Sequence, residues 1–357
     1  MQKRVTIRDI AQALGVTIGT VDRALHGRRG VNPLTKTRVL QMAQTLGYRP
    51  NLAARFLSSK RQLRISVCIP THIAMFFDAV RAGIEEEAKP FTGSGVELTF
   101  HTFPRLGYGE EEAFEKALQS GVDGFIIASG RPHKLRPLIR KTSRSRIPVI
   151  CVSTDLPGTE RLAVVSIDPR ISGSMAGELL GRFLTGQPAF AVVTGDLEIA
   201  DHAEKYQAFR STVQSLYPGI EVLSPIENHE DEAEAYKKCR KLFASREDIA
   251  GVYVSTANSI PVLQALQDLR RIDQVTIITT DLFPALAQHM RSGHVAASLY
   301  QRPGRQGRLA FRMLHQFLVE GSCPSHQVRL APHLILRSNL NFFSKNHAGN
   351  TQAGEGA

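Results

Sequence analysis

From Arg64 onward the sequence alternates between short apolar runs rich in β-branched residues and longer stretches with helical spacing. The strand-like runs include ISVCIP, GFIIAS, PVICVS, FAVVTG, GVYVST and TIITTD, and helix-like stretches such as 77–89, 172–184 and 203–216 separate them. Such an alternation is typical of parallel strands that are covered by helices on both faces of the sheet. The pattern therefore predicts a doubly wound α/β core.

This core is too long for one ordinary sheet. About 280 residues with some ten strands exceed what a single hydrophobic core usually holds, so we expect two lobes. Strands up to Asp168 are expected to begin the first lobe, and the middle of the chain is expected to form the second. We expect the chain to return near 296–301 and to cross a last time near Ile335. The tail from Lys345 is small and polar, which predicts disorder.

The positive charge of the chain is concentrated near its N-terminus. The formal net charge is +11, and the segment 1–64 contains thirteen Lys and Arg side chains against only Asp9 and Asp22. The remaining residues carry equal numbers of basic and acidic side chains. A module that neutralises phosphates explains this segregation, because each contact with nucleic acid releases condensed counterions. The neutral α/β core is expected to sense a small molecule rather than touch DNA.

The first fifty residues have the spacing of three short helices. Thr6-Ile7-Arg8-Asp9 fits a capping box that opens the first helix, and Gly15 permits a left-handed turn after it. Thr17 can cap a second helix that runs to about residue 26, and Asn32-Pro33 can begin a third. Two helices joined by a tight turn of this kind form a helix-turn-helix, so we expect an all-α headpiece.

The segment 6–57, TIRDIAQALGVTIGTVDRALHGRRGVNPLTKTRVLQMAQTLGYRPNLAARFL, closely resembles the headpiece of the LacI (lactose-repressor-like) family of transcription regulators. The resemblance implies that the second helix enters the major groove of double-stranded DNA. It implies that four residues of this helix region face base edges: Thr17, Ile18, Gly19 and Arg23. Arg23 can form a bidentate pair of hydrogen bonds with guanine. It implies phosphate contacts, which set register rather than specificity, for Thr6, Thr20, Asn32 and Tyr48.

Two positions depart from the family's pattern. Gly19 stands where a side chain often reads bases, so readout there is expected to be weaker or to use the backbone and DNA shape. Asp22 stands where Ser is common, and a carboxylate there repels phosphate unless it accepts a bond from a cytosine amino group or orients Arg23. A partner for Asp22 within the protein is the alternative. The operator is expected to differ from common family sites beneath these two residues.

Residues 51–57 resemble the family's hinge helix, which is too short to persist alone in water. The resemblance implies that this helix orders on DNA, packs against its mate in a homodimer and pushes Leu57 into the minor groove, with Asn51 and Ala54 also at the DNA. Ordinary packing of the linker is the alternative for Leu57. The two-fold symmetry of a dimer implies a pseudo-palindromic operator.

These patterns divide the chain into four parts. We expect a DNA-binding headpiece over 1–50, a hinge helix and linker over 51–63, a ligand-sensing and dimerisation core over 64–343, and a disordered tail over 344–357.

The part from Ile65 to Phe343 resembles the two-lobed type I periplasmic-binding-protein fold of ribose-binding proteins and LacI-family cores. In such open α/β sheets, ligands lie beyond the carboxyl ends of the strands. Phe76 and Phe77 fall where sugar-binding relatives carry a pair of stacking aromatic residues, although either could be simple core. The remaining candidate ligand contacts lie mostly at or just after strand ends: Ser129, Asp155, Asp168, Lys205, Ser255, Asn258, Asp281 and Gln301.

These side chains suit a sugar or polyol. A carboxylate can accept bonds from neighbouring hydroxyls, an amide or a lysine can donate, and an aromatic ring can cover an apolar C–H face. Asp168 could instead cap the helix that starts near Pro169, and the register leaves Ser255 and Asn258 as alternatives at one position. Ala74 and Lys205 stand where ribose binders often have Asn and Arg, which argues against ribose.

We therefore predict a transcription regulator, more specifically a repressor, of genes for carbohydrate uptake or catabolism. A small sugar or polyol is expected to control its affinity for the operator. A purine, nucleoside or phosphorylated-sugar effector is the alternative, and a binding protein without regulation is a more distant one. The N-terminus lacks the apolar run of a signal peptide, and no apolar stretch has the length of a membrane span, so we expect a cytoplasmic, nucleoid-associated protein. The four cysteines are far apart, no catalytic motif is present, and neither a cofactor nor enzymatic activity is expected.

Overall fold

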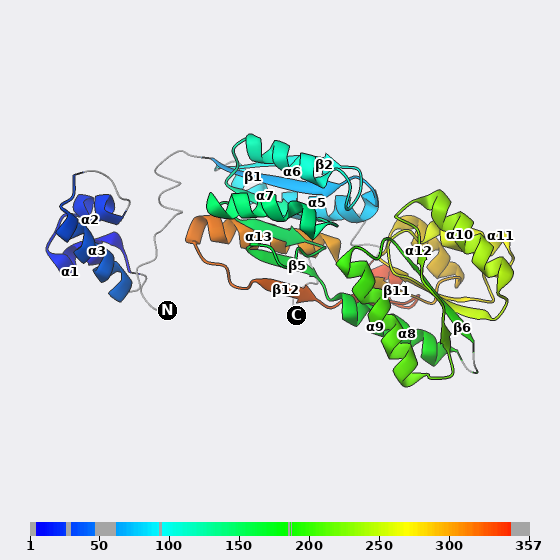
Figure 1. Cartoon of the computed structure of the whole chain (residues 1–357). Coiled ribbons are helices and arrows are strands. Elements are labelled where there is room, and N and C mark those ends of the chain that lie inside the picture. The colour runs from blue at the N-terminus through cyan, green and yellow to red at the C-terminus, as the bar shows by residue number, and fades with distance from the viewer. Residues whose placement is uncertain are drawn as a thin grey trace. The chain divides into compact units, whose positions relative to one another are not determined.

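The computed structural model describes residues 5–25, 30–46, 62–92, 95–184, 186 and 188–343. The chain separates into two compact units, a helical headpiece and a large α/β core (Figure 1). The expected tail and residues 51–61 of the expected hinge and linker lie outside the described residues.

The headpiece contains the three helices that the spacing predicts: α1 (Ile7–Leu14), α2 (Ile18–Leu25) and α3 (Pro33–Thr45). The capping box is present, because Thr6 accepts a bond from the backbone N–H of Asp9 while the Asp9 carboxylate accepts one from the backbone of Thr6. Gly15 follows α1 with φ of 65°, in the left-handed region that glycine favours. A small apolar core, which includes Ile10, Val21 and Val39, joins the three helices.

The core unit has two lobes, each built on its own sheet. The first lobe holds a six-stranded parallel sheet in the order β12-β5-β4-β3-β1-β2. Its strands are β1 (Leu63–Pro70), β2 (Val96–Phe103), β3 (Gly124–Ile127), β4 (Val149–Val152), β5 (Ala163–Ile167) and β12 (Gln327–Leu330). The central strands are buried along their whole length, as expected for strands that are covered on both faces.

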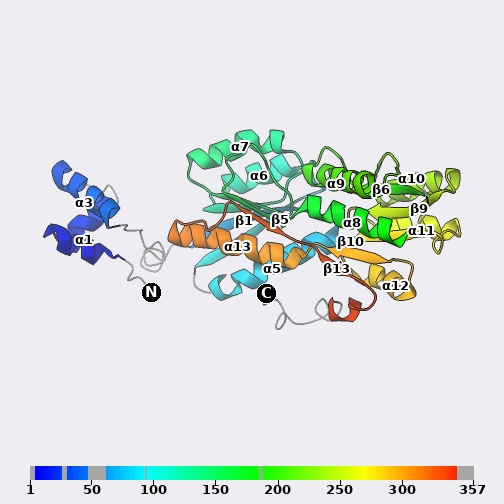
Figure 2. The ribbon, with the colours of Figure 1, turned by 90° about the horizontal axis from the view of Figure 1, so that it is seen from below.

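Helices cover both faces of this sheet: α5 (Ala74–Thr92), α6 (Glu110–Gln119), α7 (Pro132–Arg144) and α13 (Pro303–Glu320). In Figure 2, α6 and α7 lie over one face, and α5 and the beginning of α13 lie over the other. The α6–α7 side is closed by a core in which the rings of Phe114 and Phe125 stack with centroids 4.3 Å apart.

The second lobe holds a seven-stranded sheet in the order β13-β11-β10-β9-β6-β7, with β8 also paired to β6. Its strands are β6 (Ala189–Thr194), β7 (Glu221–Val222), β8 (Ile226–Glu227), β9 (Ile249–Val254), β10 (Thr276–Thr280), β11 (Ala297–Tyr300) and β13 (His333–Ile335). Every pairing is parallel except the antiparallel edge pair β11–β13.

Five helices cover this sheet: α8 (Pro169–Phe183), α9 (Ala200–Leu216), α10 (Glu232–Ser245), α11 (Ile260–Asp268) and α12 (Pro284–Ser292). One apolar cluster joins α8 and α9 to the sheet, and another joins α10, α11 and α12 to it, so the two groups of helices occupy opposite faces.

The chain crosses between the lobes three times. It leaves the first lobe at Asp168 between β5 and α8, returns at 301–302 between β11 and α13, and crosses again at 331–332 between β12 and β13. The two-lobed, parallel α/β architecture is confirmed, and the last crossing lies slightly before the expected position near Ile335.

The cysteines are free thiols. Cys68 on β1, Cys151 on β4 and Cys239 on α10 are buried, whereas Cys323 is half-buried. No helix in the described part of the chain combines the length and the apolar character that crossing a bilayer requires.

Candidate functional site

A small polar cavity of about 40 Å³ lies between the two lobes of the core. Both lobes line it, together with the crossover strand ends: Ile73, Phe76, Phe77, Leu106, Ser153, Thr154, Asp201, His202, Lys205, Glu230, Thr256, Ala257, Asp281 and Gln301. A water molecule occupies about 30 Å³ in the liquid, so this space holds little more than one water. A sugar-sized ligand therefore requires the lobes to separate or the wall side chains to move.

Several buried polar groups that line the cavity are linked by hydrogen bonds and an ion pair. Lys205 Nζ lies 2.7 Å from Asp201 Oδ2 and donates to Gln301 Oε1 over 2.9 Å. Gln301 in turn donates from its backbone N and its Nε2 to the two carboxylate oxygens of Asp281, over 3.0 and 2.6 Å. The structure thus brings together three of the predicted ligand contacts: Lys205, Asp281 and Gln301.

Two of these groups have shifted pKa values. Burial raises the pKa of Asp281 to about 6, although the two bonds from Gln301 act in the opposite direction. Burial acts to lower the pKa of Lys205, but the Asp201 carboxylate together with Tyr253 and Asp281 more than offsets burial, so the pKa of Lys205 is raised. Lys205 is consequently a permanent cation that is already paired.

Two further side chains that line the cavity, His202 and Glu230, were not predicted from the sequence. The Nδ1 atom of His202 accepts a bond of 3.0 Å from the backbone N of Asp196, and its Nε2 lies 3.7 Å from Glu230 Oε1. Burial lowers the pKa of His202 to about 4, which leaves the imidazole neutral at pH 7. Burial raises the pKa of Glu230 to about 7.

Glu230 reaches the cavity through an unusual loop after β8. His229 and Glu230 both have left-handed backbones, with φ of 48° and 61°. The backbone N–H groups of Asn228 and His229 donate to Thr194 and Gly195, so the loop is fastened to the end of β6. Gly195 provides the room, because a Cβ atom there would lie 2.4 Å from Glu230 Oε1.

Phe76 and Phe77, near the beginning of α5, both line the cavity. Both are buried, and their rings pack edge to face with centroids 5.0 Å apart. A second cavity of about 460 Å³ adjoins the first and shares Phe76, Ala257 and Asp281 with it. Its remaining lining is mainly apolar and comes from α5, α12 and the start of α13.

The structure does not bring the other predicted ligand contacts to this cavity. Asp155 is held by Arg161 and Arg329, with Oδ2 2.9 Å from Arg161 Nη2 and 3.1 Å from Arg329 Nη2. Asp168 caps α8 by accepting bonds from the backbone of Arg170 and Ile171, which is the alternative that its position before Pro169 suggested. Both carboxylates have partners within the protein.

Ser129 and Ser255 are also engaged elsewhere, and Asn258 does not line the cavity. Ser129 donates to Glu110 over 2.9 Å, and Ser255 donates to Thr194 over 2.9 Å. Between Ser255 and Asn258, it is Thr256 that lines the cavity. The position after β9 that the sequence left open is therefore occupied at the cavity by Thr256, which was not predicted.

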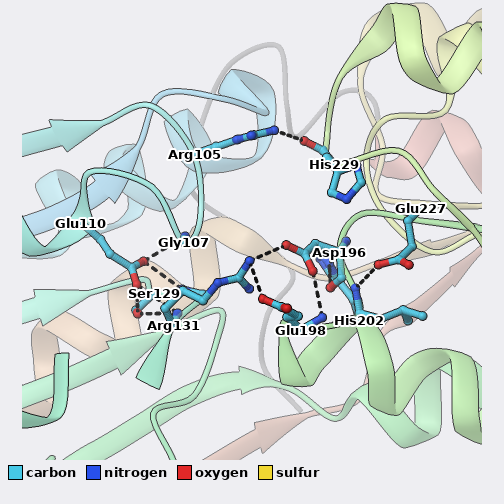
Figure 3. A network of polar contacts seen from close by, with 12 residues as sticks. Arg105, Gly107, Glu110, Ser129, Arg131, Asp196, Glu198, His202, Glu227 and His229 are labelled. Atoms are coloured by element: carbon cyan, nitrogen blue, oxygen red, sulfur yellow. Dashed lines mark hydrogen bonds and ion pairs between the residues drawn. The ribbon is translucent and has the colours of Figure 1, made fainter. Parts of the chain in front are cut away.

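Salt bridges and a hydrogen bond join the two lobes (Figure 3). Arg131, which precedes α7 in the first lobe, lies 2.8 Å from Asp196 and 2.9 Å from Glu198 in the second. Arg105 donates to the carbonyl oxygen of His229 over 3.1 Å. The buried Glu110 carboxylate accepts bonds from the backbone of Gly107, Gly130 and Arg131 and thereby fixes the loop that carries Arg131. We call the contacts of Arg131 with Asp196 and Glu198 the interlobe clasp.

In the headpiece, α2 presents the predicted reading side chains to solvent. Thr17, Ile18, Gly19 and Arg23 are exposed, and nearly half of the surface of the apolar Ile18 is accessible. Arg23 Nε donates to the carbonyl oxygen of Gly19 over 3.1 Å, so the arginine lies along the same helix face as the glycine. Asp22 is half-buried and has an interaction partner.

The predicted phosphate-contacting residues also have local roles. Thr6 caps α1, Asn32 caps α3 by accepting from the backbone N of Leu34, and Thr20 is bonded to Thr17 through their hydroxyls, 2.9 Å apart. These contacts fix the ends of the helices and leave DNA contact as a proposal. The remaining predicted DNA-binding residues lie outside the described part of the chain: Tyr48, Asn51, Ala54 and Leu57.

Comparison with known proteins identifies both units. Residues 6–51 match the family model "Bacterial regulatory proteins, lacI family", and residues 65–322 match "Periplasmic binding protein domain". Catabolite control protein A of Priestia megaterium is 26% identical over 93% of this chain and 97% of its own length. Catabolite control protein A of Staphylococcus epidermidis is 26% identical over 74% of this chain and 78% of its own.

Solved structures show the same core fold. An ABC transporter solute-binding protein from Bacillus halodurans with bound myo-inositol matches with a TM-score of 0.73, 18% identity, and coverage of 80% of this chain and 98% of that one. GanP, a glucose-galactose binding protein from Geobacillus stearothermophilus, matches with a TM-score of 0.70, 24% identity, and coverage of 78% and 99%. With its helix-turn-helix headpiece joined to a periplasmic binding protein domain, the chain belongs to the LacI family of bacterial regulatory proteins.

Proposed function

We propose that this regulator controls genes of carbohydrate uptake or catabolism, and that a small sugar or polyol between its lobes sets its affinity for the operator. The observation that carries the proposal is the presence, in one chain, of an exposed reading helix and a polar cavity between two lobes. The name of the relatives, catabolite control protein A, supports a role in carbon catabolism.

The cavity supports a ligand rich in hydroxyl groups. Ser153, Thr154 and Thr256 contribute hydroxyls to its lining, and Phe76 and Phe77 offer apolar ring surface. The structural neighbours that bind myo-inositol or glucose and galactose share this fold, which supports the same class of ligand. A ligand that prefers one arrangement of the lobes shifts the balance between the DNA-binding and non-binding forms.

A phosphorylated effector fits less well. A phosphate requires cationic or N–H donors, and the one ammonium group among the lining residues, that of Lys205, is already paired with Asp201. A purine or nucleoside is the alternative effector that the ligand test below distinguishes from a polyol.

The DNA side of the proposal follows the family headpiece. We propose that α2 enters the major groove with Thr17, Ile18, Gly19, Asp22 and Arg23, that Tyr48, Asn51 and Ala54 lie at the DNA, and that Leu57 enters the minor groove. A homodimer would then read a pseudo-palindromic operator, and the protein would act as a repressor at the nucleoid in the cytoplasm.

The DNA-binding step can be tested with duplexes selected by the full-length protein from a random library. Fluorescence anisotropy should show tight binding to the selected duplex, a steep loss of affinity with added salt, and weak binding to a scrambled duplex. Affinity that does not depend on sequence at any salt concentration would contradict the proposal.

The ligand step uses thermal shift across a panel of sugars, polyols, sugar phosphates and nucleobases. A hit should change the anisotropy titration, and Asp281→Asn should weaken it, whereas Asp273→Asn, at a side chain that is 84% exposed on the same lobe, should not. A nucleobase hit without any polyol hit would overturn the proposed ligand class.

A further inference from the structure

The interlobe cavity contains polar atoms that the protein itself does not satisfy. Neither carboxylate oxygen of Glu230 has a hydrogen-bond partner of good geometry, although the nearby Thr256 side chain acts to lower the pKa of this group, and Asp201 Oδ1 and Ser153 Oγ have no partner either. All three residues line the cavity, and the side chain of Glu230 is only 6% exposed. Buried polar groups in proteins are almost always bonded, so a cluster of unsatisfied atoms in a cavity indicates that a ligand supplies their partners.

These atoms are mostly acceptors. Above its pKa of about 7, Glu230 is ionised, and ionised carboxylates accept hydrogen bonds and cannot donate them. The matching ligand must therefore bring donors to the side of the cavity formed by Asp201 and Glu230.

The charges in the cavity are also unbalanced. The lining contains three carboxylates, those of Asp201, Glu230 and Asp281, against the single ammonium of Lys205. Lys205 is neutralised by its contact with Asp201, and the carboxylate of Asp281 is bonded to Gln301, which is uncharged. His202 faces Glu230 but stays neutral at pH 7, because burial lowers the pKa of its imidazole to about 4. A neutral polyol would leave this negative charge uncompensated after the cavity closes.

We propose that the natural ligand of this cavity is a polyol that carries a primary amine, with its ammonium group against Glu230 and the free oxygen of Asp201. The ammonium provides three donors and the missing positive charge, and the hydroxyl groups of the ligand bond to the remaining polar side chains. Phe76 and Phe77 favour the same ligand, since aromatic rings attract cations as well as apolar C–H faces. The inference rests on the proposed function and names the class of its effector.

The test is isothermal titration calorimetry of the full-length protein with matched pairs of probes. One pair is 1-amino-1-deoxysorbitol and sorbitol, and the other is glucosamine and glucose; N-acetylglucosamine and 1,4-diaminobutane complete the set. A bond to a charged group contributes about 1.5–3 kcal/mol, so each amine should bind about tenfold or more tighter than its neutral partner. Acetylation should abolish the difference, and the diamine, which lacks hydroxyls, should bind more weakly than the amino polyols.

Glu230→Gln tests the residue. It should reduce the affinity for 1-amino-1-deoxysorbitol about tenfold or more and leave that for sorbitol within about threefold. Glu232→Gln, the same change two positions away on the exposed first turn of α10, should alter neither. Circular dichroism and thermal unfolding verify that both variants fold.

The pH dependence provides a second readout. Glu230 is faced by His202, Lys205 and Asp201 on α9 and by Asp196 after β6. The alkylammonium of 1-amino-1-deoxysorbitol stays charged between pH 7.5 and 5.5, whereas Glu230 takes up a proton. Affinity for this amine should therefore fall more steeply over this range in the wild type than in Glu230→Gln, in which Asp281, with a pKa of about 6, still titrates.

The outcomes separate the two proposals. If neutral sugars bind as tightly as their amines and change operator binding, this inference is overturned and the proposed function stands. If no probe and no panel compound binds, both are overturned. Equal loss of sorbitol and amine binding in Glu230→Gln would also overturn the inference, because it would show a purely structural role.

Discussion

At the scale of single residues, Glu230 is a carboxylate in an environment that disfavours its charge. Burial raises its pKa from 4.5 to about 7, so the folded protein binds a proton here more tightly than the unfolded chain does. Folding is therefore favoured at this group at low pH, and the contribution is lost as the pH rises from about 4.5 through 7. His202 acts in the opposite direction, because its lowered pKa makes it resist protonation in the folded state below pH 6.5.

Comparing Glu230→Gln with the wild type isolates the carboxylate. Without ligand, we expect the variant to be more stable at pH 8 by about 3 kcal/mol, from a shift of 2.5 units at 1.36 kcal/mol each, and by less than about 1 kcal/mol at pH 5. Urea unfolding at the two pH values measures the difference. A variant that is less stable than the wild type at pH 8 would show that Glu230 is satisfied within the protein.

Gly19 gives a second prediction at this scale. A Cβ atom there would meet Arg23 Nη2 at 3.7 Å and Thr17 Oγ1 at 3.9 Å, which are ordinary contacts. Gly19→Ala should therefore stabilise the headpiece by about 0.5–1 kcal/mol through its helix propensity, and it should change base preference in a repeated duplex selection. An unchanged selected sequence would mean that this position is not read.

At the scale of elements, the pair α8–α9 positions the cavity. The two helices approach so closely that a Cβ atom at Gly173 would lie 2.1 Å from the carbonyl oxygen of Lys205. The backbone of α9, and with it Asp201, His202 and Lys205, is thus placed by the absence of a side chain on α8.

Gly173→Ala should force α8 and α9 apart. We expect a loss of about 1–3 kcal/mol in stability from overpacking, together with weaker ligand binding, because Lys205 and Asp201 move. Gly304→Ala on α13 is the matched control, since its Cβ would find its nearest neighbour at 3.6 Å. Equal thermal unfolding of the two variants would contradict the close approach.

The sequence predicted the elements well where they are long or buried. Continuous apolar runs identified the central strands, but β7, β8, β12 and β13 were missed because they are two to four residues long and not fully buried. At the site, Asp281 and Gln301 were found from strand ends. Glu230 was not predicted, because it lies in a loop and reaches the cavity through the left-handed backbone of His229 and of Glu230 itself. Neither residue type signals this conformation in the sequence. Asp155 has the pattern of a ligand contact, but two distant arginines hold it.

At the scale of the whole core, the interlobe clasp decides how readily the cleft opens. Arg131 is held by Glu110 through its backbone and reaches two carboxylates of the opposite lobe with its side chain (Figure 3). The Arg131 and Asp196 side chains are about nine-tenths buried, so their contact is screened less than an exposed pair.

Arg131→Ala should shift the core toward an open arrangement. We expect a larger radius of gyration in small-angle scattering and faster release of bound ligand in stopped-flow experiments, because closure no longer gains this contact. Arg140→Ala removes an exposed salt bridge with Glu160 within the first lobe and serves as the control. Identical release rates in the two variants would show that the clasp does not restrain opening.

The buried cysteines allow the two lobes to be followed separately. Burial raises the pKa of Cys68 and of Cys239 to about 12 and that of Cys151 further, so these thiols should be inert to alkylating reagents while the lobes are intact. Cys68 and Cys151 belong to the first lobe, and Cys239 to the second. Pulsed alkylation read by mass spectrometry would therefore time the unfolding of each lobe in the unmodified protein, with the half-buried Cys323 reacting first.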